Sequence, residues 1–142
     1  MKVWVKGTEI TLTKAHFVSS GGEGQIYAKD GTAYKIYTDS NKMMPLGKIQ
    51  ELATIQESNV IRPQEVLLDQ KKLPIGYSMR FIKDTYALCQ LFTKAFRDRE
   101  GVDHSTMQGL VQKLRDMVES IHKASILLVD LNEMNFLVDQ SF

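Results

Sequence analysis

A cluster of glycines followed by a lysine is the part of this chain best suited to chemistry. Gly21, Gly22 and Gly24 lack a Cβ, so the backbone can turn tightly and approach a bound group closely. Backbone amides left free at such a turn can bind phosphate oxygens, and the ammonium group of Lys35 on a neighbouring strand can neutralise them. The first hypothesis is a site for nucleotide phosphate. A flexible hairpin tip would explain the glycines alone equally well, so Lys35 is what favours the phosphate.

Three predicted strands position these residues. Val18 precedes the glycines, and Ile26 and Tyr27 follow them, which predicts a glycine-rich hairpin. Asp30-Gly31 is a strong signal for a two-residue turn, and residues 32–37 return as a third strand with Lys35 in the middle. A P-loop is excluded, because no lysine followed by serine or threonine succeeds the glycines into a helix.

A predicted helix supplies a candidate partner for the lysine. Pro45 suits the first position of a helix that we expect to run to about residue 57, with Ile49, Leu52 and Ile55 as its apolar stripe. Glu51 lies next to that stripe. Its carboxylate would either reach Lys35 across the sheet or remain solvated, and the sequence leaves both open.

Two further strands complete the predicted sheet. Residues 66–69 and 75–82 read as strands joined by the polar turn at 70–72, and residues 2–6 and 9–13 suggest an extra hairpin or edge strand at the N-terminus. Consecutive hairpins imply an antiparallel sheet of five main strands with one helix packed on a face, which is an α+β class.

The remainder is predicted to be helical, followed by a polar loop. We expect a short helix over 86–96, a charged loop over 97–101 and a long helix from Ser105, whose spacing to Gln108 fits a capping box, to about residue 123. After it, Asp130 and Asn135 lie in a polar segment that we expect to be held between two short buried strands.

Composition limits the function classes. The 142 residues are 43% apolar and 25% charged with a formal charge of +1, which is ordinary for a soluble domain and gives no bulk charge for binding nucleic acid or a membrane. Cys89, the single cysteine, cannot form an internal disulfide and fits a reducing cytoplasm. His16 and His104 lack other ligands at metal spacing, so no zinc site is expected. We expect a cytoplasmic protein without a signal peptide or membrane span.

The order of these motifs resembles the protein-kinase fold. The glycine loop resembles G-x-G-x-x-G-x-V, AYKIY around Lys35 looks like V-A-I-K, and Asp130 with Asn135 looks like the H-R-D-x-x-x-x-N loop. Three sequence segments, GGEGQIY, GYSMRFI and VDLNEMNFLV, are similar to those of bacterial and phage kinase-like proteins with a GGEG loop. The likeness covers nearly all of residues 17–138. Small-molecule kinases related to aminoglycoside phosphotransferases share the aspartate and asparagine arrangement.

The resemblance implies a site for ATP and Mg²⁺. Lys35 would bind the α- and β-phosphates while paired to Glu51, Asp130 would accept the proton of a substrate hydroxyl, and Asn135 would hold magnesium through its amide oxygen. Residues 79–83 would be the hinge between lobes, where mainly backbone atoms bind adenine. The implied nucleotide contacts in the loop and hinge are Ser19, Gly21, Gly22, Gly24, Ile26, Met79 and Phe81.

Departures from the family pattern bear on activity. Ser19 replaces the first glycine, Leu128 and Val129 replace the histidine and arginine before the aspartate, and Asn132 replaces the usual lysine after it. The chain ends at Phe142, before the D-F-G aspartate of the family. We therefore expect residues 1–82 to form the N-terminal lobe, including an extra hairpin at 1–14. Residues 83–142 would form the hinge and a partial C-terminal lobe, from a fragment or a truncated relative that is nearly inactive alone.

Three functional hypotheses follow. The preferred one is the ATP- and Mg²⁺-binding portion of a Ser/Thr-type protein kinase that phosphorylates a protein substrate in the intact chain. The alternative is a pseudokinase-like module that regulates a protein partner, or a relative that phosphorylates small molecules. The third is an unrelated α+β interaction domain. The apolar underside of the incomplete lobe predicts self-association or a covering partner.

Overall fold

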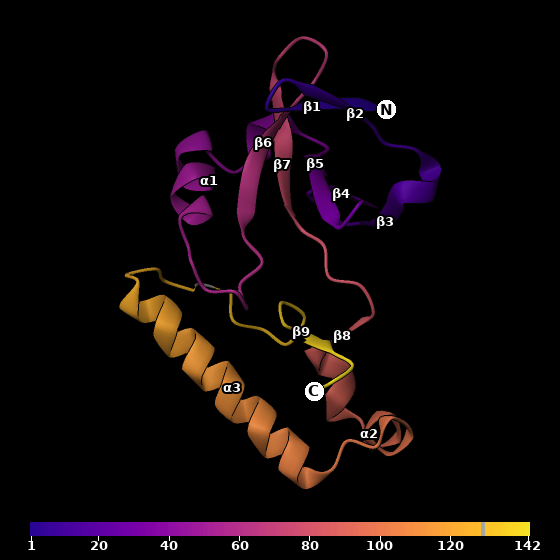
Figure 1. The fold of residues 1–142 in the computed structure, drawn as a ribbon, viewed down its shortest axis with the longest axis vertical. Coiled ribbons are helices and arrows are strands. Elements are labelled where there is room, and N and C mark those ends of the chain that lie inside the picture. The colour runs from indigo at the N-terminus through magenta and orange to yellow at the C-terminus, as the bar shows by residue number, and fades with distance from the viewer. Residues whose placement is uncertain (129) are drawn as a thin grey trace. The chain divides into compact units, whose positions relative to one another are not determined.

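The computed structural model describes residues 1–128 and 130–142, and the chain divides into two compact units, Met1–Phe81 and Ile82–Phe142 (Figure 1). Val129, one of the two residues that replace the family's histidine and arginine, lies outside the described residues. Each unit has its own apolar core, so each is described by itself.

The first unit is built on one antiparallel sheet of seven strands in the order β2-β1-β6-β7-β5-β4-β3 (Figure 1). Its strands are β1 (Lys2–Val5), β2 (Thr8–Thr11), β3 (Phe17–Ser20), β4 (Gly24–Lys29), β5 (Thr32–Tyr37), β6 (Pro63–Leu68) and β7 (Pro74–Arg80). The predicted α+β class and antiparallel sheet are confirmed, but the expected number of five strands is wrong. The N-terminal hairpin is part of the sheet, because Trp4 of β1 pairs with Leu68 of β6.

Two tight turns determine how the central strands pair, one between β4 and β5 and one between β6 and β7. Asp30 and Gly31 both have positive φ values, 49° and 75°, which is the two-residue turn predicted between β4 and β5. The turn between β6 and β7 is closed by Asp69, whose Oδ1 accepts the amides of Lys71 at 2.8 Å and Leu73 at 2.9 Å. The first hairpin places Lys35 opposite Ile26 of β4, and the pairing of β5 with β7 places it opposite Tyr77.

One helix, α1 (Leu46–Ala53), packs beside the sheet and is shorter than predicted. Its end is marked by Thr54, whose hydroxyl donates to the carbonyl oxygen of Glu51 at 2.6 Å. Two apolar clusters lie on opposite faces of the sheet, as the alternation along β5 requires. One contains Val3, Leu12, Tyr34, Ile36 and Leu67, and the other contains Tyr37, Ile49 and Tyr77. Lys35 and Tyr37 are two residues apart, so Lys35 belongs to the face that α1 covers with Ile49.

The second unit combines a small sheet with helices. Its elements are β8 (Thr85–Ala87), the 3₁₀ helix η3 (Leu88–Phe92), α2 (Lys94–Glu100), α3 (His104–Lys123) and β9 (Leu137–Asp139). The predicted helix over 86–96 is wrong at its start, because Tyr86 pairs with Val138 across β8 and β9. The predicted charged loop over 97–101 is also wrong. Its charged residues form the last turn of α2, which ends at Gly101 with φ 68°.

The long helix α3 is confirmed, with a different cap. Asp103, and not Ser105, precedes the first turn and accepts the amide of Thr106 on Oδ1 at 2.7 Å. That backbone hydrogen bond is the main reason that the pKa of Asp103 lies below its usual value. The first half of α3 packs through Leu110 against Leu91 and Phe96. Among the described helices, none is long and apolar enough to cross a membrane.

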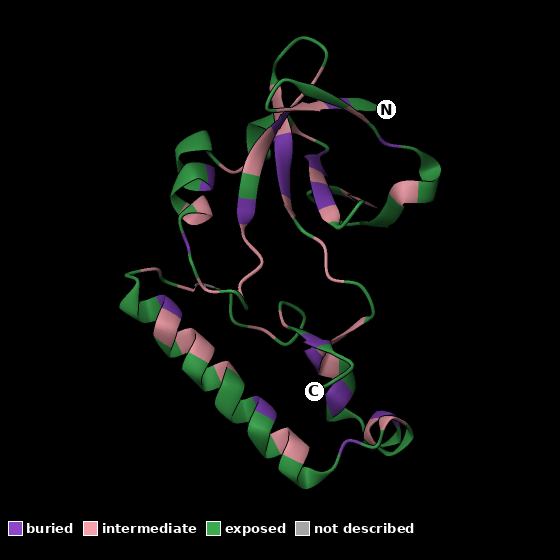
Figure 2. Cartoon of the chain, viewed as in Figure 1, coloured by how far each residue is buried: buried purple, intermediate pink, exposed green. Residues whose placement is uncertain are grey.

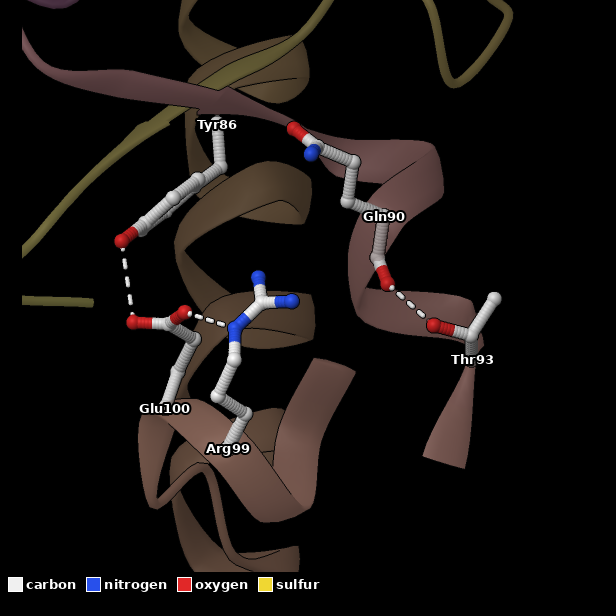
Figure 3. Close-up of polar contacts among 5 residues, drawn as sticks. All are labelled: Tyr86, Gln90, Thr93, Arg99 and Glu100. Carbon is white, nitrogen blue, oxygen red and sulfur yellow. Dashed lines mark hydrogen bonds and ion pairs between the residues drawn. The ribbon is translucent and has the colours of Figure 1, made fainter. Parts of the chain in front are cut away.

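Polar contacts join β8 to α2 (Figure 3). The Tyr86 hydroxyl donates to Glu100 Oε2 at 2.9 Å, and Arg99 Nε donates to Glu100 Oε1 at 2.7 Å. The Tyr86 ring also meets Phe96 edge-on, with centroids 4.8 Å apart. Because one tyrosine makes both contacts, the start of the unit and the end of α2 are held together.

Large apolar side chains are exposed in the second unit, and Figure 2 shows much of α3 as exposed. They include Phe92, Val111, Leu127, Leu131 and Met134, of which Leu127 is 77% exposed. Of these, only Val111 belongs to α3, the helix whose apolar face was predicted to be uncovered, and Leu110 and Ile121 of that helix are buried. Self-association or a protein partner at this face stays a prediction.

Candidate functional site

The glycine turn lies between β3 and β4 and is closed by backbone contacts. Gly21 donates its amide to the carbonyl of Gly24 at 2.9 Å, and the carbonyl of Glu23 accepts the amide of Thr38 at 3.0 Å. Within the described residues, the backbone N–H groups of Gly22 and Glu23 have no partner in the chain. Such groups are available to an anion.

The three glycines of the turn differ in what requires them. A Cβ on Gly24 would lie 2.2 Å from the carbonyl oxygen of Ile36, so the approach of β4 to β5 demands glycine there. A Cβ on Gly21 or Gly22 would meet nothing within 4 Å, and neither residue has a positive φ. Packing therefore explains Gly24, whereas nothing in the fold explains Gly21 and Gly22.

Lys35 reaches this turn from the middle of β5. Its Nζ lies 2.6 Å from Glu23 Oε2, 4.8 Å from the ring centroid of Tyr37 and 5.9 Å from that of Tyr77. The Lys35 side chain is 20% exposed. The structure thus brings together the predicted lysine and the glycine turn, with aromatic faces that attract the ammonium group.

The pair between Lys35 and Glu23 shifts both pKa values. Burial lowers the pKa of Lys35, but the hydrogen bond to Glu23 and the nearby Tyr77 and Tyr37 raise it by more, so that it lies above its usual value of 10.5. The hydrogen bond from Lys35 is the main reason that the pKa of Glu23 lies below 4.5. Burial raises the pKa of Tyr77 above its usual 10.0. At neutral pH, both members of the pair are charged.

Glu51 does not pair with Lys35 in the structure, which corrects one of the two interpretations left open above. Its Oε1 accepts a hydrogen bond from Lys48 Nζ at 3.0 Å, one turn back on α1. The reason is rotation: Ile49 is the buried residue of α1, and two residues further on a helix is about 200° around the axis. Glu51 is therefore directed away from the sheet face that holds Lys35.

Three of the other predicted nucleotide contacts, Ser19, Ile26 and Met79, lie on the same sheet. Ser19 of β3 pairs with Ile26 of β4, and Ile26 in turn is opposite Lys35. Met79 of β7 is opposite Ala33, two residues before Lys35, so Ile26 and Met79 share the face of Lys35. Phe81, the last residue of the first unit, donates its amide to the carbonyl of Gly31 at 3.0 Å.

The second unit brings Asp130, Asn132 and Asn135 together in one loop. Asn132 Nδ2 donates to Asp130 Oδ1 at 2.7 Å, while Asn135 Nδ2 donates to Asp130 Oδ2 at 3.0 Å. Asn132 Oδ1 accepts the amide of Met134 at 2.9 Å. Because the amide nitrogen of Asn135 faces Asp130, its side-chain oxygen is left without a partner among the described residues.

Of the two strands expected beside this loop, only the one that follows it is formed among the described residues. Residues 126–128 have no regular structure, whereas β9 follows the loop and pairs with β8. Leu127 lies largely in solvent, so residues 126–128 are not a buried strand.

The loop offers oxygen ligands of the kind that magnesium prefers. Asn135 Oδ1 accepts no hydrogen bond among the described residues, and Mg²⁺ commonly binds one or two protein oxygens while keeping phosphate oxygens and water as its other ligands. In the part of the chain that the structure describes, no group of three histidine, cysteine, aspartate or glutamate side chains could hold a metal by itself. A Mg²⁺ ion held by Asn135 Oδ1 would therefore need phosphate oxygens and water as its other ligands.

Sequence reasoning missed Glu23, Tyr37 and Tyr77. The signal for Glu23 was its place inside the glycine turn, where a side chain lies close to whatever the turn approaches. Tyr37 is two residues after Lys35 on the same strand, which places both on one face. Tyr77 depends on the register of β7, which the sequence does not fix.

No protein family matches this chain, and no curated protein is significantly similar to it in sequence. The functional assignment therefore depends on the residues and geometry described above.

Proposed function

We propose that this chain binds ATP with Mg²⁺ as the nucleotide-binding part of a Ser/Thr-type protein kinase. In this proposal, Met1–Phe81 is the N-terminal lobe, and Ile82–Phe142 holds the hinge and the first part of the C-terminal lobe. The observation that carries it is the ammonium group of Lys35 beside a glycine turn in which Gly21 and Gly22 have no packing role. A close-approaching anion is the simplest reason for both.

The glycine turn would bind the phosphates mainly through its backbone. The free N–H groups of Gly22 and Glu23 can donate to phosphate oxygens, and the absence of a Cβ at Gly22 lets the chain lie against them. Lys35 would add a positive charge that is only 20% exposed, and a partly desolvated charge attracts an anion more strongly than a solvated one. Ile26 and Met79 would contact the adenine from the same face.

The polar loop would carry the transfer of the phosphoryl group. A serine or threonine hydroxyl of the protein substrate attacks the γ-phosphorus, its proton passes to the carboxylate of Asp130, and the bond from phosphorus to the β–γ bridging oxygen breaks to release ADP. Asn135 would hold Mg²⁺ through Oδ1, and the metal would neutralise phosphate charge. Its Nδ2 meanwhile positions Asp130.

Nucleotide binding is tested by thermal unfolding with and without Mg-ATP. Ligand at 100 times its Kd adds about 2.7 kcal/mol to the free energy of unfolding, which is a measurable rise in Tm. The wild type should show this rise, and Lys35→Ala should abolish it. Lys2→Ala, which breaks an ion pair with Glu9 of 2.8 Å in the same sheet, is the control and should behave as the wild type. No rise in the wild type would contradict the proposal.

Phosphoryl transfer is tested separately on the intact chain. Asp130→Asn should leave ATP binding unchanged and abolish transfer from labelled ATP to a protein hydroxyl. If the wild type binds Mg-ATP but transfers nothing to protein, the alternatives are favoured. A regulatory pseudokinase-like module would also leave small alcohols unmodified, whereas a small-molecule phosphotransferase would not.

A further inference from the structure

The ammonium group of Lys35 is already occupied by a carboxylate from the glycine turn. Glu23 Oε2 lies 2.6 Å from Lys35 Nζ, which is the distance of a charge-assisted hydrogen bond. Glu23 is the residue between Gly22 and Gly24, so this carboxylate extends from the backbone that would lie against a phosphate. The anion position on Lys35 is therefore filled from within the chain.

We propose that Glu23 is an internal competitor for the phosphate site, which holds Lys35 in the absence of nucleotide and must swing away before ATP binds. This inference rests on the proposed nucleotide binding. It assigns to Glu23 the role of setting the affinity of the site for polyphosphates.

The geometry allows Glu23 to leave without unfolding the turn. Its carbonyl stays bonded to the amide of Thr38 at 3.0 Å, so rotation of the side chain is sufficient. The side chain of Glu23 is 69% exposed, and within the described residues Lys35 is the sole partner of its carboxylate. Its neighbour Gly22 presents no side chain that would obstruct the movement.

Lys35 would remain in place after Glu23 has left. The rings of Tyr37 and Tyr77 lie 4.8 Å and 5.9 Å from its Nζ and attract a cation electrostatically. Tyr37 and Tyr77 belong to the core cluster of α1 and are buried, so they do not depend on the turn for their position. Lys35 is thus already in position for the ligand, whereas Glu23 must move before the ligand can bind.

Displacement also implies selectivity by charge. Lys35 and Glu23 together carry no net charge, so a weakly charged anion gains little by replacing the carboxylate. A polyphosphate chain gains more, because it contacts Lys35 and the free amides of the turn together. The inferred ligands are di- and triphosphates, with monophosphate as a poor competitor.

The test compares Glu23→Gln with Glu65→Gln by isothermal titration calorimetry. Glu65 is paired with Lys6, also at 2.6 Å and in the same sheet, so it is a matched control for loss of one carboxylate from an ion pair. The probes are Mg-ATP and inorganic tripolyphosphate. We expect Glu23→Gln to bind both roughly two- to fivefold more tightly than the wild type, the range for breaking an exposed ion pair, and Glu65→Gln to be unchanged.

Each outcome supports or overturns the inference. Tighter binding of Mg-ATP and tripolyphosphate by Glu23→Gln alone supports competition at the phosphate position. Equal or weaker binding by Glu23→Gln, while Lys35→Ala still abolishes binding, overturns the inference and leaves nucleotide binding intact. No binding of either probe by any variant overturns the inference together with the proposed function. A circular dichroism spectrum of each variant verifies that the sheet is formed.

Discussion

Asn135 donates twice to Asp130 from a single amide nitrogen, to the backbone oxygen at 2.9 Å and to Oδ2 at 3.0 Å. The two bonds fix the orientation of the amide, so the oxygen of Asn135 is turned away from Asp130 and is available to a cation. One asparagine therefore positions a carboxylate and presents a metal ligand. The neutral amide group performs both tasks, the nitrogen as a donor and the oxygen as an acceptor.

Replacing Asn135 by alanine should weaken the dependence of ATP binding on magnesium. The variant removes the amide oxygen that would hold Mg²⁺, whereas the contacts of Lys35 to phosphate remain. We expect the Kd for ATP in the presence of EDTA to be unchanged and the improvement caused by Mg²⁺ to shrink. Asn59→Ala is the control, because the side chain of Asn59 has one hydrogen bond among the described residues, which its Oδ1 accepts from the Ser58 hydroxyl at 3.3 Å. Full magnesium dependence in Asn135→Ala would exclude this ligand role.

Gly24→Ala and Gly22→Ala should separate packing from ligand binding. At Gly24 the new methyl would meet the Ile36 oxygen at 2.2 Å, and overpacking of this kind costs about 1–3 kcal/mol. At Gly22 the methyl meets nothing, so the free energy of unfolding should stay constant or rise by up to about 1 kcal/mol. Gly22→Ala should nevertheless bind Mg-ATP more weakly. Urea unfolding and calorimetry measure the two effects. A stable Gly22→Ala with wild-type affinity would show that the turn does not contact the ligand.

Gly76→Ala should destabilise the sheet where β7 lies beside Lys35 of β5. A Cβ at Gly76 would lie 1.9 Å from the carbonyl oxygen of Lys35, so β5 and β7 would have to separate. We expect a loss at or beyond the upper end of the range of about 1–3 kcal/mol for overpacking. Gly47→Ala, in the exposed first turn of α1 with nothing within 4 Å, is the matched control and should stabilise slightly. Equal urea midpoints for the two variants would contradict the close approach of the strands.

The ion pair between Glu23 and Lys35 should contribute stability between two pH limits. Because the pKa of Glu23 is lowered below 4.5, its contribution is complete above pH 4.5 and is lost as the pH falls through the lowered value. Because the pKa of Lys35 is raised above 10.5, its contribution is complete below pH 10.5 and is lost as the pH rises through the raised value. The difference in Tm between the wild type and Glu23→Gln should therefore be constant between these limits and disappear at both extremes. A difference that peaks or changes sign at neutral pH would indicate another partner.

The sequence predicted the elements that are specified by neighbouring residues. The Asp30-Gly31 turn and the alternation around Lys35 predicted β4 and β5, and the apolar face containing Leu110 predicted α3. The start of the second unit could not be predicted in the same way. Tyr86 forms a strand because of Val138, which is distant in the chain, and helical propensity in residues 86–96 does not reveal that pairing.

The sequence left the partner of Lys35 open for a similar reason. Which carboxylate reaches a lysine depends on the rotation and length of the helix that carries it, and α1 turns Glu51 toward Lys48. Glu23, in contrast, is fixed by the glycine turn and the register of β4 against β5. The loop of Asp130 was predicted as a polar segment, but its internal hydrogen bonds follow from side-chain geometry that spacing alone does not determine.

The two-residue connection at Asp30 and Gly31 also sets which side of the sheet carries the positive charge. Strand pairing has a period of two, so one inserted residue there that shifts the register of β5 would direct Lys35 into the opposite apolar layer, beside the positions of Tyr34 and Ile36. The glycine turn could remain intact and still face no cation. Length at this hairpin tip, and not merely its composition, is thus a condition for the candidate site to exist.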